Sequence, residues 1–215
     1  MLEAIEKRDE ISVAATNTLH RLIDAGAIHP ILESIKTSLQ PSDVTVVIPV
    51  HNEEALRLNA LISKLSAAHE VLLIDDGSTI PLADIYGARV IRREVAGGPA
   101  AARNTAIDFV TSSITFFLDA DTSLADDSWT KLLAHFEDST VGVVAPRISS
   151  EPGTTLLHRY EASESPLDLG SEPARIRKNS RVSYLPTAAL MIRTDLLREH
   201  RGFDESLRYG EDVDL

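Results

Sequence analysis

Short apolar runs alternate with amphipathic segments along most of the chain. Each run is rich in Val, Ile, Leu or Phe, as expected of a strand that is buried on both faces. The runs predict strands at residues 44–50, 70–75, 88–93, 113–119 and 139–146. Helical spacing between them predicts a helix capped by Asn52 that carries Leu58, Leu61, Ile62 and Leu65, and helices within 97–110 and 126–138.

This alternation, with its short connections, predicts the fold class. A strand–helix repeat favours an α/β fold with an open, mainly parallel, twisted sheet and helices on both faces. Open sheets of this kind bind ligands beyond the carboxyl ends of their strands.

The first 42 residues differ from the rest. Apolar residues recur loosely at helical spacing as far as Ile23, Gly26 is a plausible stop, and Pro30 can begin a second short helix through Leu39. We expect a helical N-terminal arm at 1–42 that packs on the main domain, with a partner-docking element as the alternative. The main domain, 43–215, is expected to divide into halves at 43–123 and 124–215.

Composition narrows the function classes. The 215 residues are 43% hydrophobic and 25% charged, the profile of a soluble globular protein. A net charge of −12 argues against nucleic acid or an anionic membrane as a partner. The absence of cysteine excludes disulfides and thiolate metal sites. No apolar run is long enough to span a membrane, and the charged start "MLEAIEKRDE" is unlike a signal peptide, so a cytoplasmic location is expected.

Acidic clusters follow three of the predicted strands. "HNEE" follows the first strand, "DDGST" the second and "DADTS" the fourth. Asp119 and Asp121 in the last cluster repel each other, so they need either open water or a cation. Such a pair can bind Mg²⁺ or Mn²⁺ together with substrate phosphates; a solvated turn is the alternative. Neither the glycine-rich dinucleotide motif after the first strand nor a P-loop is present.

The motifs in order resemble those of family 2 glycosyltransferases. They are "VVIPVHNEE", "LLIDDGS", "GGPAAARNTA", "FFLDADTS", "YLPTAALMIR", "GFDESL" and "GEDVDL", and the resemblance covers residues 44–215. It implies the GT-A fold and transfer from a nucleotide-diphospho-sugar with inversion of the anomeric centre. "VAPRI" and "RYEASESPLDLG" are also similar to the mycofactocin-system glycosyltransferases. That subgroup implies glycosylation of a peptide-derived redox cofactor or its precursor from UDP-glucose.

The resemblance also implies roles for individual residues. Asp121 would bind the metal, Mg²⁺ or Mn²⁺, and Asp119 the metal or the ribose. The nucleotide sugar would contact further residues near the strand ends, namely Pro49, Val50, Glu53, Asp76, Arg103 and Ala120. Among these, Asp76 resembles the aspartate that binds the uracil ring, and Arg103 would offset the charge of the diphosphate.

Catalysis by inversion needs a base, which the resemblance assigns to "GEDVDL". Asp212 would take the proton of the acceptor hydroxyl, with Glu211 as a neighbouring candidate. The chain stops at Leu215, so we expect either a fragment of a longer enzyme, incomplete at its C-terminal side, or a short family member.

The long connection at residues 159–186 is expected to be an irregular lid or binding loop. Tyr160, Glu161 and Asp168 are the candidate contacts to a small peptide-derived or glycan acceptor, with an ordinary surface excursion as the alternative. Two other functions remain open. One is a glycosyltransferase of polysaccharide or lipid-carrier biosynthesis, and the other is a non-catalytic module that binds a nucleotide sugar or a partner.

Overall fold

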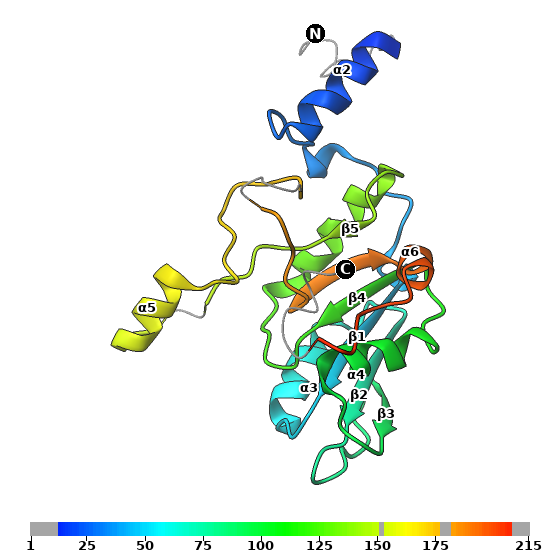
Figure 1. Ribbon diagram of the computed structural model, residues 1–215, viewed down its shortest axis with the longest axis vertical. Helices are drawn as coiled ribbons and strands as arrows, with labels where there is room; N and C mark the ends of the chain where they lie inside the picture. The colour runs from blue at the N-terminus through cyan, green and yellow to red at the C-terminus, as the bar shows by residue number, and fades with distance from the viewer. Residues whose placement is uncertain (1–12, 151–152, 177–181, 208–215) are drawn as a thin grey trace.

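The protein is built on a six-stranded sheet with helices on both faces (Figure 1). The computed structural model describes residues 13–150, 153–176 and 182–207. The strand order is β3-β2-β1-β4-β6-β5. The strands are β1 Val44–Val50, β2 Glu70–Asp76, β3 Arg89–Arg93, β4 Ile114–Leu118, β5 Val143–Val144 and β6 Ala189–Arg193. The predicted α/β class is confirmed.

The sheet is parallel in one half and antiparallel in the other. Strand β1 pairs in parallel with β2 and β4, and β2 pairs in parallel with β3. Strand β6 runs antiparallel to both β4 and β5. The sequence did not predict β6, and the strand predicted at 139–146 is reduced to the two residues of β5. Strand β5 is short because it lies at the edge of the sheet and is soon followed by Pro146, which has no backbone N–H to donate to a neighbouring strand.

Two hydrophobic layers cover the sheet. On one face, α3 (Ala55–Ser63) and η3 (Asp126–Glu137) pack on alternate residues of β1. On the other face, α4 (Gly98–Ile107) and α6 (Thr194–Glu199) pack against β2 and β4. The predicted helix at 126–138 is present as a 3-10 helix. The predicted cap of α3 is wrong, because Glu54 precedes the helix while Asn52 has a φ of 57°.

The N-terminal arm is helical over α2 (Val13–Asp24), which stands apart from the sheet in Figure 1. The second helix predicted from Pro30 to Leu39 is wrong. Only the single 3-10 turn η1 (Leu32–Ser34) forms there, with extended backbone at both of its ends. Thr37 and Ser38 instead bind the carboxylate of Glu137, which ties the arm to η3. A further 3-10 turn, η2 (Pro41–Asp43), leads into β1. The domain boundary at 42/43 stays a prediction.

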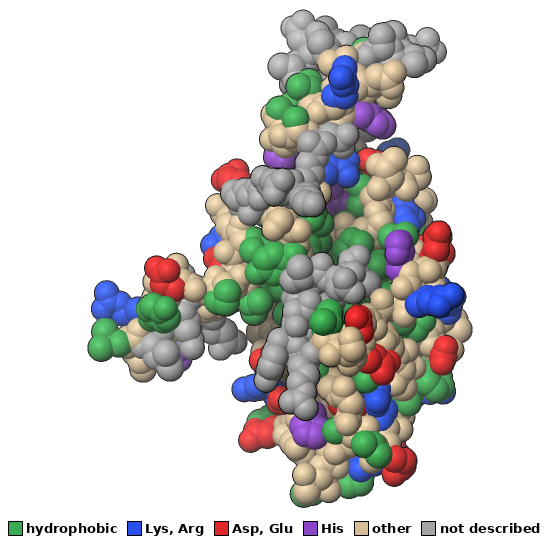
Figure 2. All heavy atoms as spheres, viewed as in Figure 1, with side chains coloured by type: hydrophobic (Ala, Val, Ile, Leu, Met, Phe, Trp, Pro, Cys, Tyr) green, Lys and Arg blue, Asp and Glu red, His purple; other side chains and the backbone are tan. Residues whose placement is uncertain are grey.

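The connection at 159–186 begins within a helix, which corrects the expectation of an irregular segment. Helix α5 (Leu156–Glu164) starts where the Thr155 side chain accepts from His158 N–H, and it projects from the body in Figure 1. The space-filling view shows hydrophobic, basic and acidic side chains at the surface of this projection (Figure 2). Among the described residues, no helix has the length and apolar character needed to cross a membrane.

Candidate functional site

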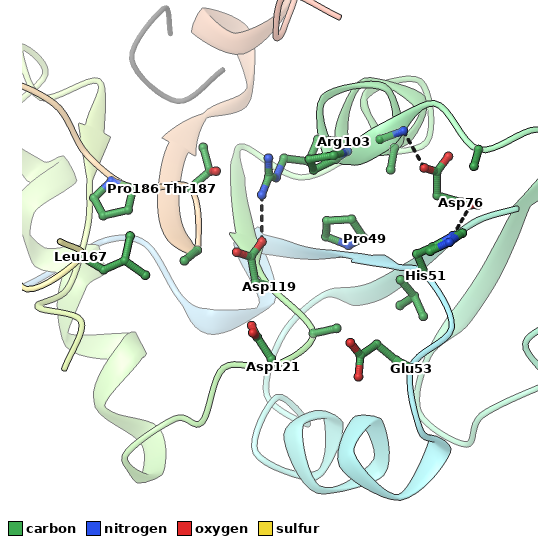
Figure 3. Close-up of a pocket in the computed structure, with 17 residues that line it drawn as sticks. Pro49, His51, Glu53, Asp76, Arg103, Asp119, Asp121, Leu167, Pro186 and Thr187 are labelled. Carbon is green, nitrogen blue, oxygen red and sulfur yellow. Dashed lines mark hydrogen bonds and ion pairs between the residues drawn. The ribbon is translucent and has the colours of Figure 1, made fainter. Parts of the chain in front are cut away.

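A cavity of about 570 Å³ opens at the carboxyl ends of β1, β2 and β4 (Figure 3). Parallel strands end together at this edge, so the polar segments that follow them converge there. The first residues of α4 and the chain that enters β6 complete the wall. The lining comprises Pro49, Val50, His51, Glu53, Asp76, Ala96, Gly98, Pro99, Ala102, Arg103, Asp119, Ala120, Asp121, Leu167, Pro186, Thr187 and Ala188.

The structure brings together every residue that the sequence predicted for the nucleotide sugar and the metal. Pro49 and Val50 end β1, Asp76 ends β2, and Arg103 lies on α4. The remaining members of the predicted set follow β1 or β4 and also line the cavity, namely Glu53, Asp119, Ala120 and Asp121. Their convergence comes from the order of the parallel strands. Their individual roles stay predictions.

Arg103 and Asp119 form an ion pair within the cavity wall. Arg103 Nη2 donates to Asp119 Oδ1 at 2.8 Å, and the Arg103 side chain is only 2% exposed. The guanidinium also lies over the ring of Phe203, 5.6 Å from its centroid. These two contacts fix the orientation of the guanidinium. A positive charge with a fixed orientation suits a site for an anionic ligand. The Asp119 backbone N–H donates to Ala188 O and so links the cluster to the chain entering β6.

Asp121 faces the cavity two residues further along (Figure 3). It is exposed, and its side chain makes no hydrogen bond or ion pair with any residue that the structure describes. No group of three His, Asp or Glu side chains able to hold a metal ion occurs within residues 13–150, 153–176 and 182–207. Two carboxylates nevertheless fit Mg²⁺ or Mn²⁺, because such ions complete their shell with water and substrate phosphates.

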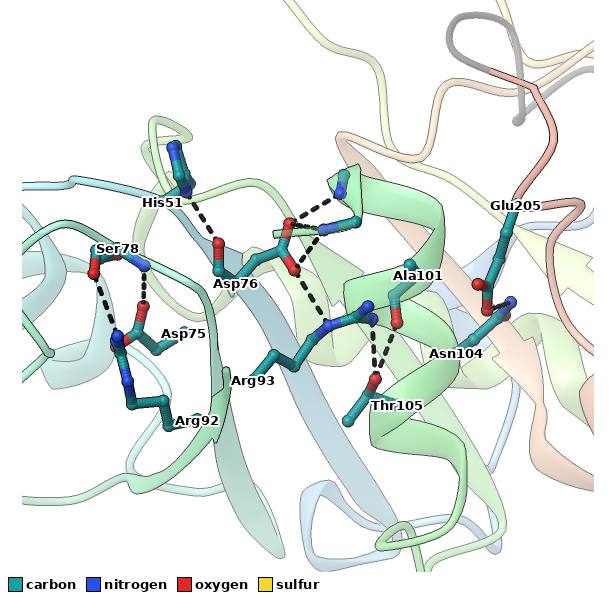
Figure 4. Close-up of polar contacts among 12 residues, drawn as sticks. His51, Asp75, Asp76, Ser78, Arg92, Arg93, Ala101, Asn104, Thr105 and Glu205 are labelled. Carbon is teal, nitrogen blue, oxygen red and sulfur yellow. Dashed lines mark hydrogen bonds and ion pairs between the residues drawn. The ribbon is translucent and has the colours of Figure 1, made fainter. Parts of the chain in front are cut away.

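The carboxylate of Asp76 holds the start of α4 (Figure 4). It accepts from the backbone N–H of Gly97 at 3.0 Å and of Gly98 at 2.7 Å, and it pairs with Arg93 Nε at 3.0 Å. Arg93 Nη1 in turn donates to Thr105 Oγ1 at 2.9 Å, which attaches β3 to the same helix. Asp76 therefore shapes the cavity wall, and its predicted contact to the base stays a prediction.

Asp75 is fully buried beside Asp76, and its carboxylate accepts hydrogen bonds from the loop that follows β2. It accepts from the backbone N–H of Ser78 at 2.9 Å and of Leu82 at 3.0 Å, and from Arg92 at 2.6 Å. Burial by itself raises the pKa of this carboxyl group. The hydrogen bonds from Ser78, Leu82 and Arg92 outweigh burial and lower the pKa to about 2.

Sequence reasoning missed His51, which lines the cavity between Val50 and Asn52. His51 Nδ1 lies 2.8 Å from Asp76 O, and His51 Nε2 lies 2.9 Å from Asn52 Nδ2. Because a carbonyl oxygen only accepts, the ring proton sits on Nδ1 and Nε2 accepts from Asn52. His51 therefore joins the loop after β1 to the end of β2. Its position within "PVHNEE" was the available signal.

The antiparallel half supplies lining residues that the sequence did not single out, namely Leu167, Pro186, Thr187 and Ala188. Three of them belong to the quoted motif "YLPTAALMIR", which was the signal for this part of the wall.

Two of the predicted acceptor residues, Tyr160 and Asp168, are not among the residues that line the cavity. Tyr160 is 65% exposed on α5, and the side chain of Glu161 lies outside the described residues. Asp168 accepts two hydrogen bonds from Arg147, at 2.9 and 2.7 Å, and these lower its pKa to about 2. Asp212 and Glu211, the candidates for the catalytic base, also lie outside the described residues.

Comparison with known proteins agrees with this geometry. The family described as "Glycosyl transferase family 2" matches residues 45–200. The chain is 41% identical, over 98% of its length, to a pre-mycofactocin glycosyltransferase of Mycobacterium tuberculosis, of which the match covers 45%. It is 30% identical to the succinoglycan biosynthesis protein ExoU of Rhizobium meliloti, over 83% of this chain and 57% of that protein. The chain thus spans about half the length of these relatives.

Solved structures share the fold. TarS 1–349 of S. aureus superposes with a TM-score of 0.57 at 22% identity, over 79% of this chain and 52% of that one. The mannosyltransferase PcManGT of Pyrobaculum calidifontis, solved with GDP-Man and Mn²⁺, gives a TM-score of 0.56 at 17% identity, over 91% and 56%. These likenesses identify the expected GT-A fold.

Proposed function

The chain belongs to glycosyl transferase family 2, and from this premise we propose that it transfers a hexose from a nucleotide-diphospho-sugar to an acceptor hydroxyl. UDP-glucose is the proposed donor. The observation that carries the proposal is the cluster of Arg103, Asp119 and Asp121 at the carboxyl-end cavity. Arg103 offers a diphosphate a positive charge in a chain of net charge −12. Asp119 and Asp121, with one residue between them, offer carboxylate ligands to the metal ion that accompanies the diphosphate.

The donor would lie across the ends of β1, β2 and β4. Pro49 and Val50 offer an apolar wall for the nucleoside, and His51 and Asp76 bring polar groups to the same end of the cavity. Arg103, further along α4, lies beside Asp119, where a diphosphate would meet its positive charge. A cavity of about 570 Å³ is within the range of ligand sites for small organic molecules.

Asp121 and Asp119 are the proposed ligands of Mg²⁺ or Mn²⁺. When bound, such an ion supplies Lewis-acid stabilisation of the charge on a departing diphosphate. Asp121 faces the cavity without a described partner, so its oxygens can turn to a ligand at no cost to existing bonds. Asp119 is already oriented by Arg103.

The proposed reaction is a single displacement. The acceptor hydroxyl gives its proton to the carboxylate of Asp212, and its oxygen forms a bond to the anomeric carbon. The bond from that carbon to the diphosphate oxygen breaks, UDP leaves with the electron pair, and the anomeric configuration inverts. Asp212 carries this role by its place in "GEDVDL", with Glu211 as its neighbour.

The proposed acceptor is a small peptide-derived molecule of the mycofactocin type. The 41% identity over nearly the whole chain, including the N-terminal arm that the family match leaves out, favours it. Tyr160, Glu161 and Asp168 remain the proposed acceptor contacts, and a cytoplasmic location belongs to the same proposal. The 30% identity to a succinoglycan biosynthesis protein makes polysaccharide synthesis the second candidate.

Calorimetric titration of UDP-glucose tests the donor site. We expect binding in the presence of Mn²⁺, loss of binding with EDTA, and loss of binding in Asp121→Ala. Because Asp121 is exposed and makes no described contact, the variant should unfold at the same temperature as the wild type. If the folded protein binds neither UDP-glucose nor UDP with metal present, the donor assignment is wrong. Binding without any release of UDP, even when an acceptor hydroxyl is supplied, would favour the non-catalytic module.

A further inference from the structure

The side-chain amide of Asn104 clamps the backbone of Phe203 onto α4. Phe203 N–H donates to Asn104 Oδ1 at 2.8 Å, and Asn104 Nδ2 donates back to Phe203 O at 2.8 Å. The Asn104 side chain thus binds both the N–H and the C=O of Phe203, as a neighbouring β-strand would. Asn104 Nδ2 also donates to Glu205 Oε1 at 2.9 Å, a contact that Figure 4 shows between the two side chains.

Gly202 fits the clamp closely. A Cβ atom there would lie 2.3 Å from Asn104 Oδ1 and 2.7 Å from Ile107 Cδ1. The backbone of Gly202 also has a φ of +74°, a conformation that side chains disfavour. Both features let the chain that leaves α6 turn directly beneath Asn104.

The clamp is next to the donor cavity. Arg103, the preceding residue of α4, pairs with Asp119 and lies over the Phe203 ring. The Phe203 ring also meets Phe117 of β4 edge-on, with centroids 5.2 Å apart. Consecutive residues of one helix therefore hold the cavity wall and the segment Phe203–Glu205. Asp212, the proposed base, follows Glu205 by seven residues and lies outside the described residues.

We infer that Asn104 is a positioning residue for the transfer step. It fixes Phe203–Glu205 on α4. It thereby fixes the point from which the chain continues towards Asp212. This inference rests on the proposed function for its catalytic consequence. The clamp itself is independent of the proposed function, because its hydrogen bonds are part of the described fold. Displacement of a reacting group by about 1 Å can cost about a hundredfold in rate.

Two variants separate the clamp from simple packing. Asn104→Ala removes all three hydrogen bonds. Asn104→Asp keeps the size and the acceptor for Phe203 N–H, but it turns a carboxylate oxygen towards Phe203 O and the Glu205 carboxylate. Asn59→Ala is the matched control, because Asn59 also lies on a helix, is exposed and donates only to Ala55 O.

The experiment has one structural and one kinetic arm. The chain has no cysteine, so Ser206→Cys, at an exposed position, carries a single nitroxide label. We expect its spectrum to show faster motion in both Asn104 variants and no change in the Asn59 control. With UDP-glucose, Mn²⁺ and water as the acceptor of the glucosyl group, we expect UDP release to fall about tenfold or more, while the calorimetric Kd for UDP-glucose stays within about twofold.

The outcomes are distinguishable. Unchanged label motion in both Asn104 variants overturns the clamp. Faster label motion with an equal loss of donor affinity overturns the positioning role, because Asn104 would then support the cavity itself. If the wild-type protein neither binds UDP-glucose nor releases UDP from it, the proposed function fails, while the label spectra still decide whether Asn104 holds Phe203–Glu205.

Discussion

A Cβ atom built on Gly77 would lie 2.6 Å from the backbone nitrogen of Ala96. Gly77 follows β2 directly and has a φ of +66°, while Ala96 lines the cavity just before α4. The loops after β2 and β3 can therefore approach this closely only because residue 77 has no side chain.

Gly77→Ala should destabilise the protein and weaken donor binding together. The close atom is backbone, so the Ala96 loop must move, and the backbone conformation itself costs about 1–2 kcal/mol for an alanine. We expect a loss of about 2 kcal/mol or more in the free energy of unfolding, measured by urea denaturation. Calorimetric titration of UDP with Mn²⁺ should show weaker binding in the same variant.

Gly26→Ala is the control for this experiment. Gly26 has a φ of +69°, but nothing lies within 4 Å of its Cβ position, and it is outside the cavity lining. It should reproduce the backbone strain without the change in UDP affinity. Equal UDP affinity in wild type and Gly77→Ala would contradict the close approach as a requirement of the site.

Asp75 should make the protein sensitive to acid. Its pKa is about 2 in the folded state and 3.8 when unperturbed, so the unfolded chain binds the proton more tightly. The stabilisation is therefore complete above pH 3.8 and disappears as the pH falls through about 2. The difference corresponds to about 2 kcal/mol. Asp75→Asn should remove this part of the pH dependence and be less stable at pH 7.

The measurement is the free energy of unfolding in urea from pH 2 to pH 7. Asp168 is the comparison, because its pKa is also about 2 but its partner Arg147 is half exposed. Salt should reduce the effect of Asp168→Asn and change that of Asp75→Asn much less. A pH profile for Asp75→Asn that is parallel to the wild type would contradict the assignment.

The parallel half of the fold could be predicted because each strand carries its own local signal. Strands β1, β2 and β4 are continuous apolar runs that end in polar residues, so the converging site residues followed from strand order alone. Strand β6 was missed because the five residues "ALMIR" are followed at once by α6, and their antiparallel pairing with β4 depends on tertiary contacts.

The partners of the site residues were the harder part. The sequence singled out Asp76, but the groups that it binds, Arg93 and the Gly97 N–H, lie 17 and 21 residues later and come close only when β3 pairs with β2. Likewise, Arg103 was predicted to meet the diphosphate, and nothing local indicated that its guanidinium would be buried against Asp119. Spacing along the chain predicts which groups reach an edge of the sheet. It does not predict how they pair there.

Arg103→Lys tests whether the pairing geometry matters beyond the charge. The lysine keeps the positive charge but loses the planar fork that reaches Asp119 while lying over the Phe203 ring. We expect the affinity for UDP with Mn²⁺ to fall about tenfold, or about 1.4 kcal/mol, by calorimetry. Arg103→Ala should lose more and also lower the free energy of unfolding, because Arg103 is buried and its removal leaves Asp119 without this ion pair.

Arg89→Lys is the matched control for the arginine substitution. Arg89 lies 3.8 Å from Glu70 and its guanidinium is 5.1 Å from the centroid of the Phe109 ring, but it is exposed and outside the cavity lining, and such a surface pair contributes little to stability. UDP affinity and stability should both stay at the wild-type values. If Arg103→Lys bound UDP as tightly as the wild type, positive charge alone would suffice at this position. The orientation of Asp119 by the guanidinium would then have no part in donor binding.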